Sequence, residues 1–300
     1  MTQSAVDSAG VTESARILKP RRGLVASLRR FARRHVGATV GGCIVFLFIL
    51  IAVFAPLIAP YDPLELFPGQ LRQPPSMQHL MGTDEIGRDI LSRIIYGSRI
   101  SLRVGLISVG IAAVGGVVLG LIAGYFGGAV DTVIMRVMDV LLAFPGILLS
   151  IAIVAILGPG INNVMIAVGI EAIPVYVRTV RGSTLTTREE DFVLAARASG
   201  ASASRIIFRH ILPNILAPVI VLGTLGVGIA ILTAAGLSFI GLGAQPPQAE
   251  WGTMLATARV YLQSTPWLAI FPGATIMIVV LALNLLGDGL REALDPRMRL

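Results

Sequence analysis

The sequence predicts an all-α membrane protein with six transmembrane helices. Its 300 residues are 55% hydrophobic and 14% charged, whereas soluble domains carry about 25% charged residues. Five runs contain no charged residue: 37–60, 104–124, 140–157, 214–249 and 260–287. A sixth, shorter run at 161–177 contains one acid. About 20 apolar residues span the hydrocarbon core of a bilayer, and these runs lack the polar faces of core helices in a soluble protein.

The first 36 residues form a basic tail ahead of the first predicted span, 37–60. They contain eight Arg and Lys residues against two acids. Such a tail directly before a spanning helix sets topology and attracts anionic lipid, so it predicts a cytoplasmic N-terminus rather than nucleic-acid binding. The apolar run is too long for a cleavable signal peptide, and we expect it to remain as an anchor. The single cysteine, Cys43, allows no disulfide framework.

With a cytoplasmic N-terminus and six spans, each connecting segment is assigned to one side of the membrane. Residues 61–103 and 242–266 are then external, and residues 178–213 and the tail 291–300 are cytoplasmic. The segment 178–213 carries six arginines against three acids, whereas arginines and acids balance in 61–103. This difference agrees with the positive-inside rule.

The external segment 61–103 is predicted to be a loop followed by an interfacial helix. Pro and Gly are frequent in its first half, and the pattern becomes helical after Thr83, which is placed to cap the helix. Apolar residues then fall on one face, with Arg88, Asp89 and Arg93 largely opposite. This arrangement is typical of a helix that lies in the membrane interface before a span.

Glycines recur at every fourth position of the second span, at Gly116, Gly120 and Gly124. They share one helix face, and small residues at this spacing allow two backbones to approach closely in lipid. The stripe therefore predicts tight packing against another helix, either within this chain or in a partner.

Two features mark the third span. Arg136 and Asp139 are three residues apart, share a helix face, and are predicted to form a structural ion pair. Pro145-Gly146 follows within the span and predicts a kink, because proline cannot complete the helical hydrogen bonding.

The fourth span contains Glu171, three residues before Pro174. An acid inside the membrane is costly, so it either faces a water-filled path or is hydrogen-bonded to a neighbouring helix. Both interpretations remain open at this point. Asn284, a polar residue in the last apolar run, is the second candidate for a translocation path.

The segment 181–213 is predicted to form a compact helical hairpin. Thr187 and Glu190 have the spacing of a capping box at a helix start. Gly200 is placed to end that helix in a left-handed conformation. Ser202 or Ser204 then caps a second short helix, and Pro213 breaks the chain before the fifth span. A hairpin tethered at both ends to spanning helices is poorly suited to bind a DNA duplex.

Ala195-Ala196, Gly200 and Leu212-Pro213 stand at the spacing of the Glu-Ala-Ala loop of ABC importer permeases, and the segment resembles that loop. In those permeases the loop inserts into a cleft on the nucleotide-binding subunit. This chain departs from the pattern at Leu194, where the family has Glu, and at His210, where it has Ile. With both departures, the segment resembles the corresponding loop of the dipeptide/oligopeptide (peptide/nickel) branch of these permeases. Further stretches resemble the C-type subunit of that branch: 82–93, 238–252 and 286–297.

The resemblance implies a type I ABC importer permease fold with both termini cytoplasmic, in a bacterial inner (cytoplasmic) membrane. Residues 104–290 would form a five-helix core behind the anchor helix. The implied substrates are di- and oligopeptides, with nickel or glutathione as alternatives. The implied partners are a second homologous permease subunit, one or two ABC ATPase subunits that bind ATP and Mg, and an external solute-binding (lipo)protein. The residues implied for ATPase coupling are Phe192, Ala195, Ala196, Arg197, Ser199, Gly200, Ala201, Ser202, Arg205, Arg209 and Pro213.

The sequence predicts no catalytic residue, bound cofactor or metal site in this chain. It lacks the Gly-x-x-x-x-Gly-Lys-Ser/Thr loop that binds nucleotide phosphates, and three histidines with one cysteine offer no metal cluster. An ion-coupled secondary transporter is the main rival interpretation, but it would need intramembrane ion ligands, for which Glu171 is the one strong candidate. A purely structural membrane protein is a second rival, and it leaves the hairpin unexplained.

Overall fold

The computed structural model describes residues 35–294. The predicted basic tail therefore lies outside the described residues, except for its last two positions, as does most of the predicted tail 291–300. The described regular elements are helices: α2 Val36–Val53, α3 Ala55–Ile58, α4 Ile90–Phe126, α5 Gly128–Leu142, α6 Gly146–Leu157, α7 Ile161–Thr187, α8 Asp191–Ala198, α9 Ala203–Ile206, a π-helical turn Ile207–Ile211, α10 Leu212–Phe239, α11 Trp251–Ala258, a 3-10 turn Arg259–Tyr261 and α12 Trp267–Leu294.

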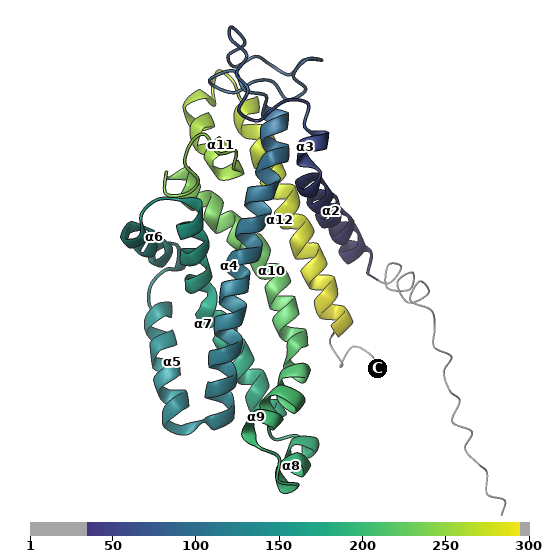
Figure 1. Cartoon of the computed structure of the whole chain (residues 1–300), viewed down its shortest axis with the longest axis vertical. Coiled ribbons are helices and arrows are strands. Elements are labelled where there is room, and N and C mark those ends of the chain that lie inside the picture. The colour runs from purple at the N-terminus through teal and green to yellow at the C-terminus, as the bar shows by residue number, and fades with distance from the viewer. Residues whose placement is uncertain (1–34, 295–300) are drawn as a thin grey trace, which may run out of the picture.

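The long helices run side by side as an elongated bundle (Figure 1). Five helical segments are long and apolar enough to cross a membrane, and a sixth span results if α5 and α6 count as one broken span. The predicted number of six spans is reached in this way. The segment between α3 and α4 lies with α11 at one end of the bundle, and α8 and α9 lie at the other.

Buried apolar residues form three clusters along the bundle. One joins α4, α10, α11 and α12 around Trp251, and a second joins α4, α6, α7 and α10 around Val168. The third joins α4, α7 and α10 to α8 and α9 around Ile206. The outward faces are also apolar, for example at Phe46, which is 60% exposed. An apolar exterior around a packed core is what a lipid environment requires.

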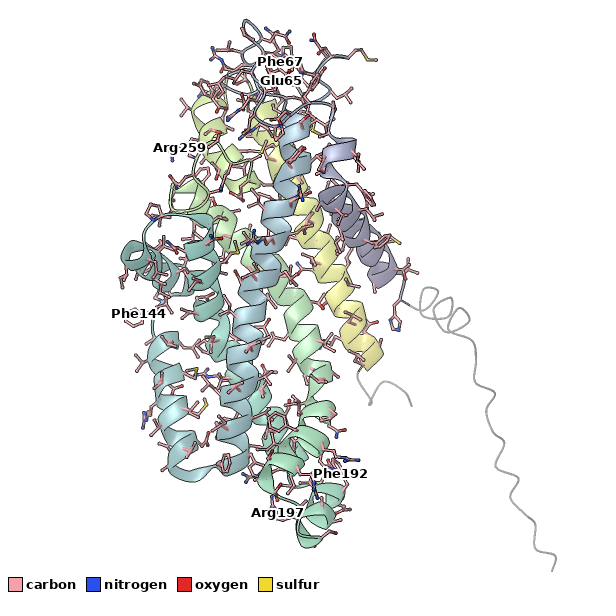
Figure 2. All side chains as sticks on the ribbon, in the orientation of Figure 1. Glu65, Phe67, Phe144, Phe192, Arg197 and Arg259 are labelled. Carbon is pink, nitrogen blue, oxygen red and sulfur yellow. The ribbon has the colours of Figure 1, made fainter. Side chains whose placement is uncertain are left out.

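The predicted kink in the third span is a sharp break. α5 and α6 meet at an angle of 92°. Pro145 is the N-cap of α6 and has an extended conformation, with φ −56° and ψ 129°. Proline lacks the N–H that would continue the hydrogen-bond ladder of α5. Phe144, at the break, is 57% exposed (Figure 2).

The glycine stripe of α4 packs against α7 of the same chain, which confirms the predicted close approach. A Cβ atom built on Gly120 would lie 2.7 Å from Val180 Cβ, and one on Gly124 would lie 2.7 Å from Thr184 Cβ. Gly116 faces Tyr176 in the same way. Residue numbers rise together along both helices, so α4 and α7 run parallel.

The predicted interfacial helix before the second span is wrong, because α4 begins at Ile90 and continues without a break through the span. Asp89, not Thr83, caps it by accepting a hydrogen bond from the Ser92 N–H. Thr83 is instead fully buried in the preceding loop, where its hydroxyl accepts from the Gln73 N–H at 2.8 Å. Because the Thr83 hydroxyl is hydrogen-bonded within the loop, it does not cap α4.

The charged residues at the start of α4 are buried, whereas the predicted interfacial helix places them opposite its apolar face. Arg88, Asp89 and Arg93 are 7%, 1% and 4% exposed. Arg88 Nε donates to Asp84 Oδ2 at 2.6 Å, and Arg93 Nε lies 3.5 Å from the same oxygen. Arg93 also donates to the Pro63 carbonyl at 3.1 Å. These contacts hold the preceding loop against α4.

The predicted ion pair between Arg136 and Asp139 is wrong. Asp139 instead accepts from Arg178 of α7, with Nη2 and Oδ1 2.8 Å apart. Charges three or four residues apart on one helix gain only about 0.2–0.5 kcal/mol, so a side chain of the adjacent helix can replace the local partner.

Arg178→Ala is expected to change the free energy of unfolding by less than about 1 kcal/mol, because exposed ion pairs contribute little. The side chains of Arg178 and Asp139 are 52% and 49% exposed. Thermal unfolding of the purified protein in detergent measures the effect, with the exposed Arg136→Ala as the matched control. A melting temperature far below that of the control would contradict the expectation.

Candidate functional site

A hairpin of two short helices projects at the end of the molecule away from α11 (Figure 1). α8 and α9 are placed between α7 and α10 in the chain, within the segment 181–213 where the hairpin was predicted. The first part of that segment, up to Thr187, belongs to α7.

Gly200 ends α8 as predicted. Its φ of 79° is in the left-handed region that favours glycine. The Gly200 N–H bonds to the Arg197 carbonyl at 3.0 Å, and the Ala201 N–H bonds to the Ala196 carbonyl at 3.1 Å. This pair of bonds is a Schellman motif, which satisfies carbonyl groups at the end of a helix.

Of the two serines predicted as alternative caps of the second helix, Ser202 is the cap and accepts a hydrogen bond of 3.4 Å from the Arg205 N–H, whereas Ser204 lies within the helix. The predicted capping box of Thr187 and Glu190 is wrong. Thr187 is the last residue of α7, and Glu190 is the N-cap of α8 without a side-chain cap bond. The helix from the fourth span extends further than expected and takes up the residue that would have capped α8.

Pro213 does not break the chain, in contrast to the prediction. A π-helical turn, Ile207–Ile211, joins α9 to α10 so that 203–239 forms one helix. Pro213 lies in the first turn of α10, where the wider hydrogen bonding of the π-turn accommodates its missing N–H. The Asn214 side chain donates to the His210 carbonyl at 2.6 Å in the same region.

Each helix of the hairpin inserts one apolar side chain into the core. Val193 of α8 is 0% exposed and Ile206 of α9 is 1% exposed. Both belong to the cluster that includes Leu121 of α4 and Val180 of α7. The hairpin is therefore packed onto the spanning helices and is not a loose loop.

Most residues predicted for coupling lie on the outer surface of the hairpin. Phe192 and Arg197 are seen at this end of the molecule in Figure 2, and Phe192 is 43% exposed. Ala196 and Ala201 are half-buried. The others are exposed: Ala195, Arg197, Ser199, Gly200, Ser202, Arg205, Arg209 and Pro213.

Three notable residues of this region are not among those predicted for coupling. Leu194 is 42% exposed and Phe208 is 65% exposed, so the outer surface contains apolar side chains beyond Phe192. Leu194 follows the buried Val193 directly, and Phe208 is two residues after the buried Ile206. In a helix with one buried face, such neighbours point to a different side, and this spacing could have identified both as exposed. Arg188 Nη1 donates to the Gly124 carbonyl at the end of α4, at 2.9 Å, and no local pattern indicates that contact.

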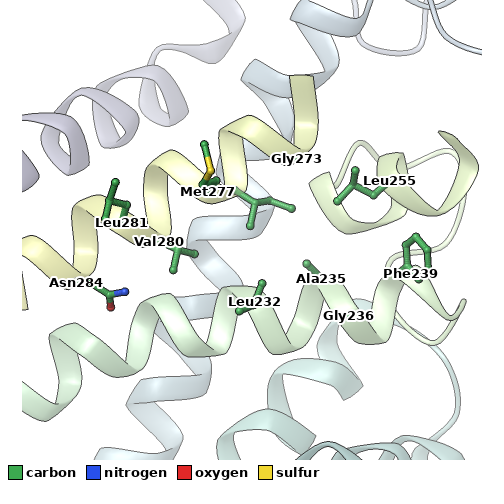
Figure 3. A pocket seen from close by; sticks show the side chains of 11 residues that line it. Leu232, Ala235, Gly236, Phe239, Leu255, Gly273, Met277, Val280, Leu281 and Asn284 are labelled. Atoms are coloured by element: carbon green, nitrogen blue, oxygen red, sulfur yellow. The ribbon is translucent and has the colours of Figure 1, made fainter. Parts of the chain in front are cut away.

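The two residues predicted for the translocation path lie in different places. Asn284 of α12 lines a pocket of about 600 Å³ between α10, α11 and α12, with Leu232 and Met277 among its walls (Figure 3). Glu171 does not line this pocket. Its carboxylate lies directly against Gly146, at the break between α5 and α6.

The chain matches two families. Residues 116–300 match the family described as binding-protein-dependent transport system inner membrane component. Residues 26–75 match the N-terminal TM domain of oligopeptide transport permease C. The first match covers more than half of the chain and includes the α8–α9 hairpin and both candidate path residues.

Curated relatives match over most of their length. The chain is 54% identical over 262 residues to the dipeptide transport system permease protein DppC of Alkalihalophilus pseudofirmus, covering 87% of this chain and 86% of that protein. It is 50% identical over 272 residues to the di/tripeptide transport system permease protein DppC of Pseudomonas aeruginosa, covering 88% and 90%. It is also 50% identical over 272 residues to the glutathione transport system permease protein GsiD of Pectobacterium atrosepticum, covering 90% of each.

The fold is similar to a solved transporter structure. A chain of the MetNI methionine ABC transporter, in an inward-facing conformation, superposes with a TM-score of 0.55 at 18% identity, covering 68% of this chain and 96% of that chain. Systems of this kind combine permeases with ATPase and substrate-binding partners. The chain is therefore a multi-pass protein of the bacterial inner membrane with the type I ABC permease fold, and it belongs to the family of inner membrane components of binding-protein-dependent transport systems.

Proposed function

We propose that this chain is one of two permease subunits of an ATP-driven importer of di- and oligopeptides, and that its α8–α9 hairpin docks on an ABC ATPase. The observation that carries the proposal is the hairpin itself, which is exposed on its outer side and packed into the core on its inner side. The peptide permeases among the relatives support the substrate class. Glutathione is the second candidate, because other relatives are named for it.

The core contacts of the hairpin support a mechanism of coupling. Val193 and Ile206 share one buried cluster with Leu121 of α4 and Val180 of α7, and the π-helical turn makes α9 continuous with α10. Packed interiors transmit displacement because they have few voids. A shift of the docked hairpin is therefore passed to three long helices at once.

In this proposal the hairpin end and both termini face the cytoplasm, and the end with α11 faces outward. ATP and Mg bind to the ATPase partner, and this chain performs no catalytic step. An external solute-binding protein delivers the peptide to the α11 end. The arginines of the hairpin agree with the positive-inside rule.

The pocket at Asn284 is proposed as this chain's half of the translocation path. Leu232, Met277 and Leu281 line it and are more than half exposed. A contiguous apolar surface that lines a pocket indicates an interaction face, and a second, homologous permease subunit would complete the path. The position of Glu171 against Gly146 favours a role in helix packing over a role in an ion pathway. This weakens the alternative that the chain is an ion-coupled secondary transporter.

Ala195→Arg is expected to abolish ATP-driven peptide uptake while the chain still folds and reaches the membrane. Ala195 is exposed in α8, and arginine is a good helix former, so bulk and charge are added to the outer surface without unfolding the helix. Uptake of labelled dialanine into proteoliposomes that contain the assembled transporter and ATP measures the effect.

Gly182→Arg is the matched control. Gly182 is exposed on α7 near the same end, and no atom lies within 4 Å of a Cβ built there. It receives the same charge outside the hairpin and is expected to retain uptake. Full ATP-driven uptake by the Ala195→Arg variant would contradict the docking role, and uptake that needs an ion gradient but no ATP would favour the secondary transporter.

A further inference from the structure

A second pocket, of about 460 Å³, lies at the α11 end of the molecule. The end of α10, the following connection and α11 with Tyr261 form its walls, and Glu85 of the α3–α4 segment closes one side. Its size is within the range of small-molecule sites. The pocket contains one carboxylate side chain, Glu85, and one guanidinium, Arg259.

The Arg259 guanidinium has no ion-pair partner among residues 35–294. Arg259, labelled in Figure 2, places its guanidinium carbon 5.8 Å from the centroid of the Phe239 ring. Glu250, the acid of the same connection, is 3% exposed and accepts hydrogen bonds of 2.9 Å from the Gly252 and Thr253 N–H groups. Because the Glu250 carboxylate caps α11, it does not pair with Arg259, and the Arg259 guanidinium is available to bind an anionic ligand.

Glu85 is the second charged group of the pocket with unused capacity. Its Oε1 accepts from Arg88 Nη2 at 3.0 Å, and its Oε2 has no hydrogen-bond partner among residues 35–294. Ser238 lines the pocket and is 2% exposed, and its hydroxyl has no hydrogen-bond partner in the described part of the chain. This oxygen is enclosed by the chain, directly against Gly243, so Ser238 contributes to the wall of the pocket and not to ligand binding.

We propose that this pocket is an entry site for short peptides with free ends: Arg259 binds the terminal carboxylate and Glu85 binds the terminal ammonium group. An unpaired guanidinium and a partly free carboxylate in one pocket are complementary to a zwitterion, and bonds between charged partners are stronger than neutral ones. The proposal rests on the proposed function, because it assumes that peptides reach this end of the molecule.

The pocket also adjoins the pocket that contains Asn284. Phe239 lines both, and Arg259 lies over the Phe239 ring. A peptide held by its charged ends at the polar pocket is therefore next to the apolar walls between α10 and α12. The site binds what all unblocked peptides share, whatever their side chains.

Cysteine protection tests the site in the assembled transporter. In a Cys43→Ser background, Val260→Cys offers a thiol at a pocket residue that is 75% exposed. Dialanine is expected to slow its labelling by a membrane-impermeant maleimide, and N-acetyl-dialanine amide, which lacks both charges, is not. Met77→Cys is the control, because Met77 is 95% exposed in the α3–α4 segment and does not line the pocket.

Arg259→Gln is expected to raise the dialanine concentration for half-protection by about tenfold, because a hydrogen bond to a charged group is lost. Protection by dialanine amide, which has no carboxylate, should not change. Arg99→Gln is the matched control, since Arg99 is exposed on α4 and outside the pocket. Unchanged protection by dialanine in the Arg259→Gln variant, or equal protection by the blocked peptide, overturns the proposal.

Uptake of labelled dialanine by the same complex separates the two proposals. Protection without uptake rejects peptide import and retains the site. Uptake without protection rejects the site and retains import.

Discussion

Gly116→Leu is expected to prevent α4 from packing against α7 and to abolish accumulation of the folded chain. A Cβ atom at Gly116 would overlap the Tyr176 side chain and lie 3.0 Å from the carbonyl carbon of Tyr176. The side chain cannot turn away from a backbone atom, so the two helices would have to separate. Overpacking of a core costs about 1–3 kcal/mol when side chains can adjust, and a clash with backbone leaves less room for adjustment.

Separation of α4 and α7 would also expose the neighbouring contacts. Gly120 and Gly124 meet Val180 and Thr184 along the same line, and the α8–α9 hairpin is anchored on the end of these two helices. We therefore expect loss of both the bundle and the hairpin. The amount of monodisperse protein after detergent extraction, measured by fluorescence-detected gel filtration, reports this directly.

Gly110→Leu is the matched control on the same helix. Gly110 is exposed, and no atom lies within 4 Å of a Cβ built there. The same substitution at Gly110 is expected to leave the yield unchanged. A normal elution profile for the Gly116→Leu variant would show that the α4–α7 contact is not needed for folding.

Asp84→Leu is expected to destabilise the α11 end of the molecule by about 3–5 kcal/mol, the cost of leaving a buried charge without its partner. Asp84 is 5% exposed. One oxygen accepts from the backbone of Arg88 at 2.9 Å, and the other accepts from its guanidinium at 2.6 Å. Arg93 lies 3.5 Å from that second oxygen. The substitution leaves the buried Arg93 guanidinium without an acid among the described residues and leaves Arg88 paired with Glu85 alone, at 3.0 Å.

Thermal unfolding in detergent and protease sensitivity of the α3–α4 segment measure this effect. Asp62→Asn is the control, because Asp62 is an exposed acid of the same segment whose Oδ1 accepts from the Leu64 N–H, a bond that Asn preserves. Combining Asp84→Leu with Arg93→Met should restore part of the stability, since the charge left without an acid is removed as well. Equal melting temperatures for the Asp84→Leu and Asp62→Asn variants would contradict the structural role of the cluster.

Several features of the fold could be predicted because they depend on residues close together in the chain. The charge-free runs identify the spanning helices, since lipid solvates no charge. Pro145 breaks the third span because it lacks an N–H. Gly200 ends α8 because glycine readily adopts the left-handed backbone conformation, here φ 79°, that closes a helix. The glycine stripe of α4 predicted a close helix contact from spacing alone.

Only the tertiary structure decided which partners the charged residues find. Asp139 pairs with Arg178 of another helix instead of Arg136. Periodicity alone places Arg88 and Arg93 opposite the apolar face of a helix, but the folded loop brings Asp84 against both and buries them. Asp139 and Arg178 are 39 residues apart, and Arg93 is 30 residues from the Pro63 carbonyl that it contacts, so no local pattern describes their approach.

The hairpin shows the same division at the proposed docking surface. Its position, its end at Gly200 and the cap at Ser202 were predicted from local hydrogen-bonding chemistry. The π-helical turn before Pro213 and the insertion of Val193 and Ile206 into the core were not. Local backbone preferences thus determined where the helices end, and packing against α4 and α7 decided which side chains remain exposed to a partner, because burial depends on neighbours that are distant in sequence.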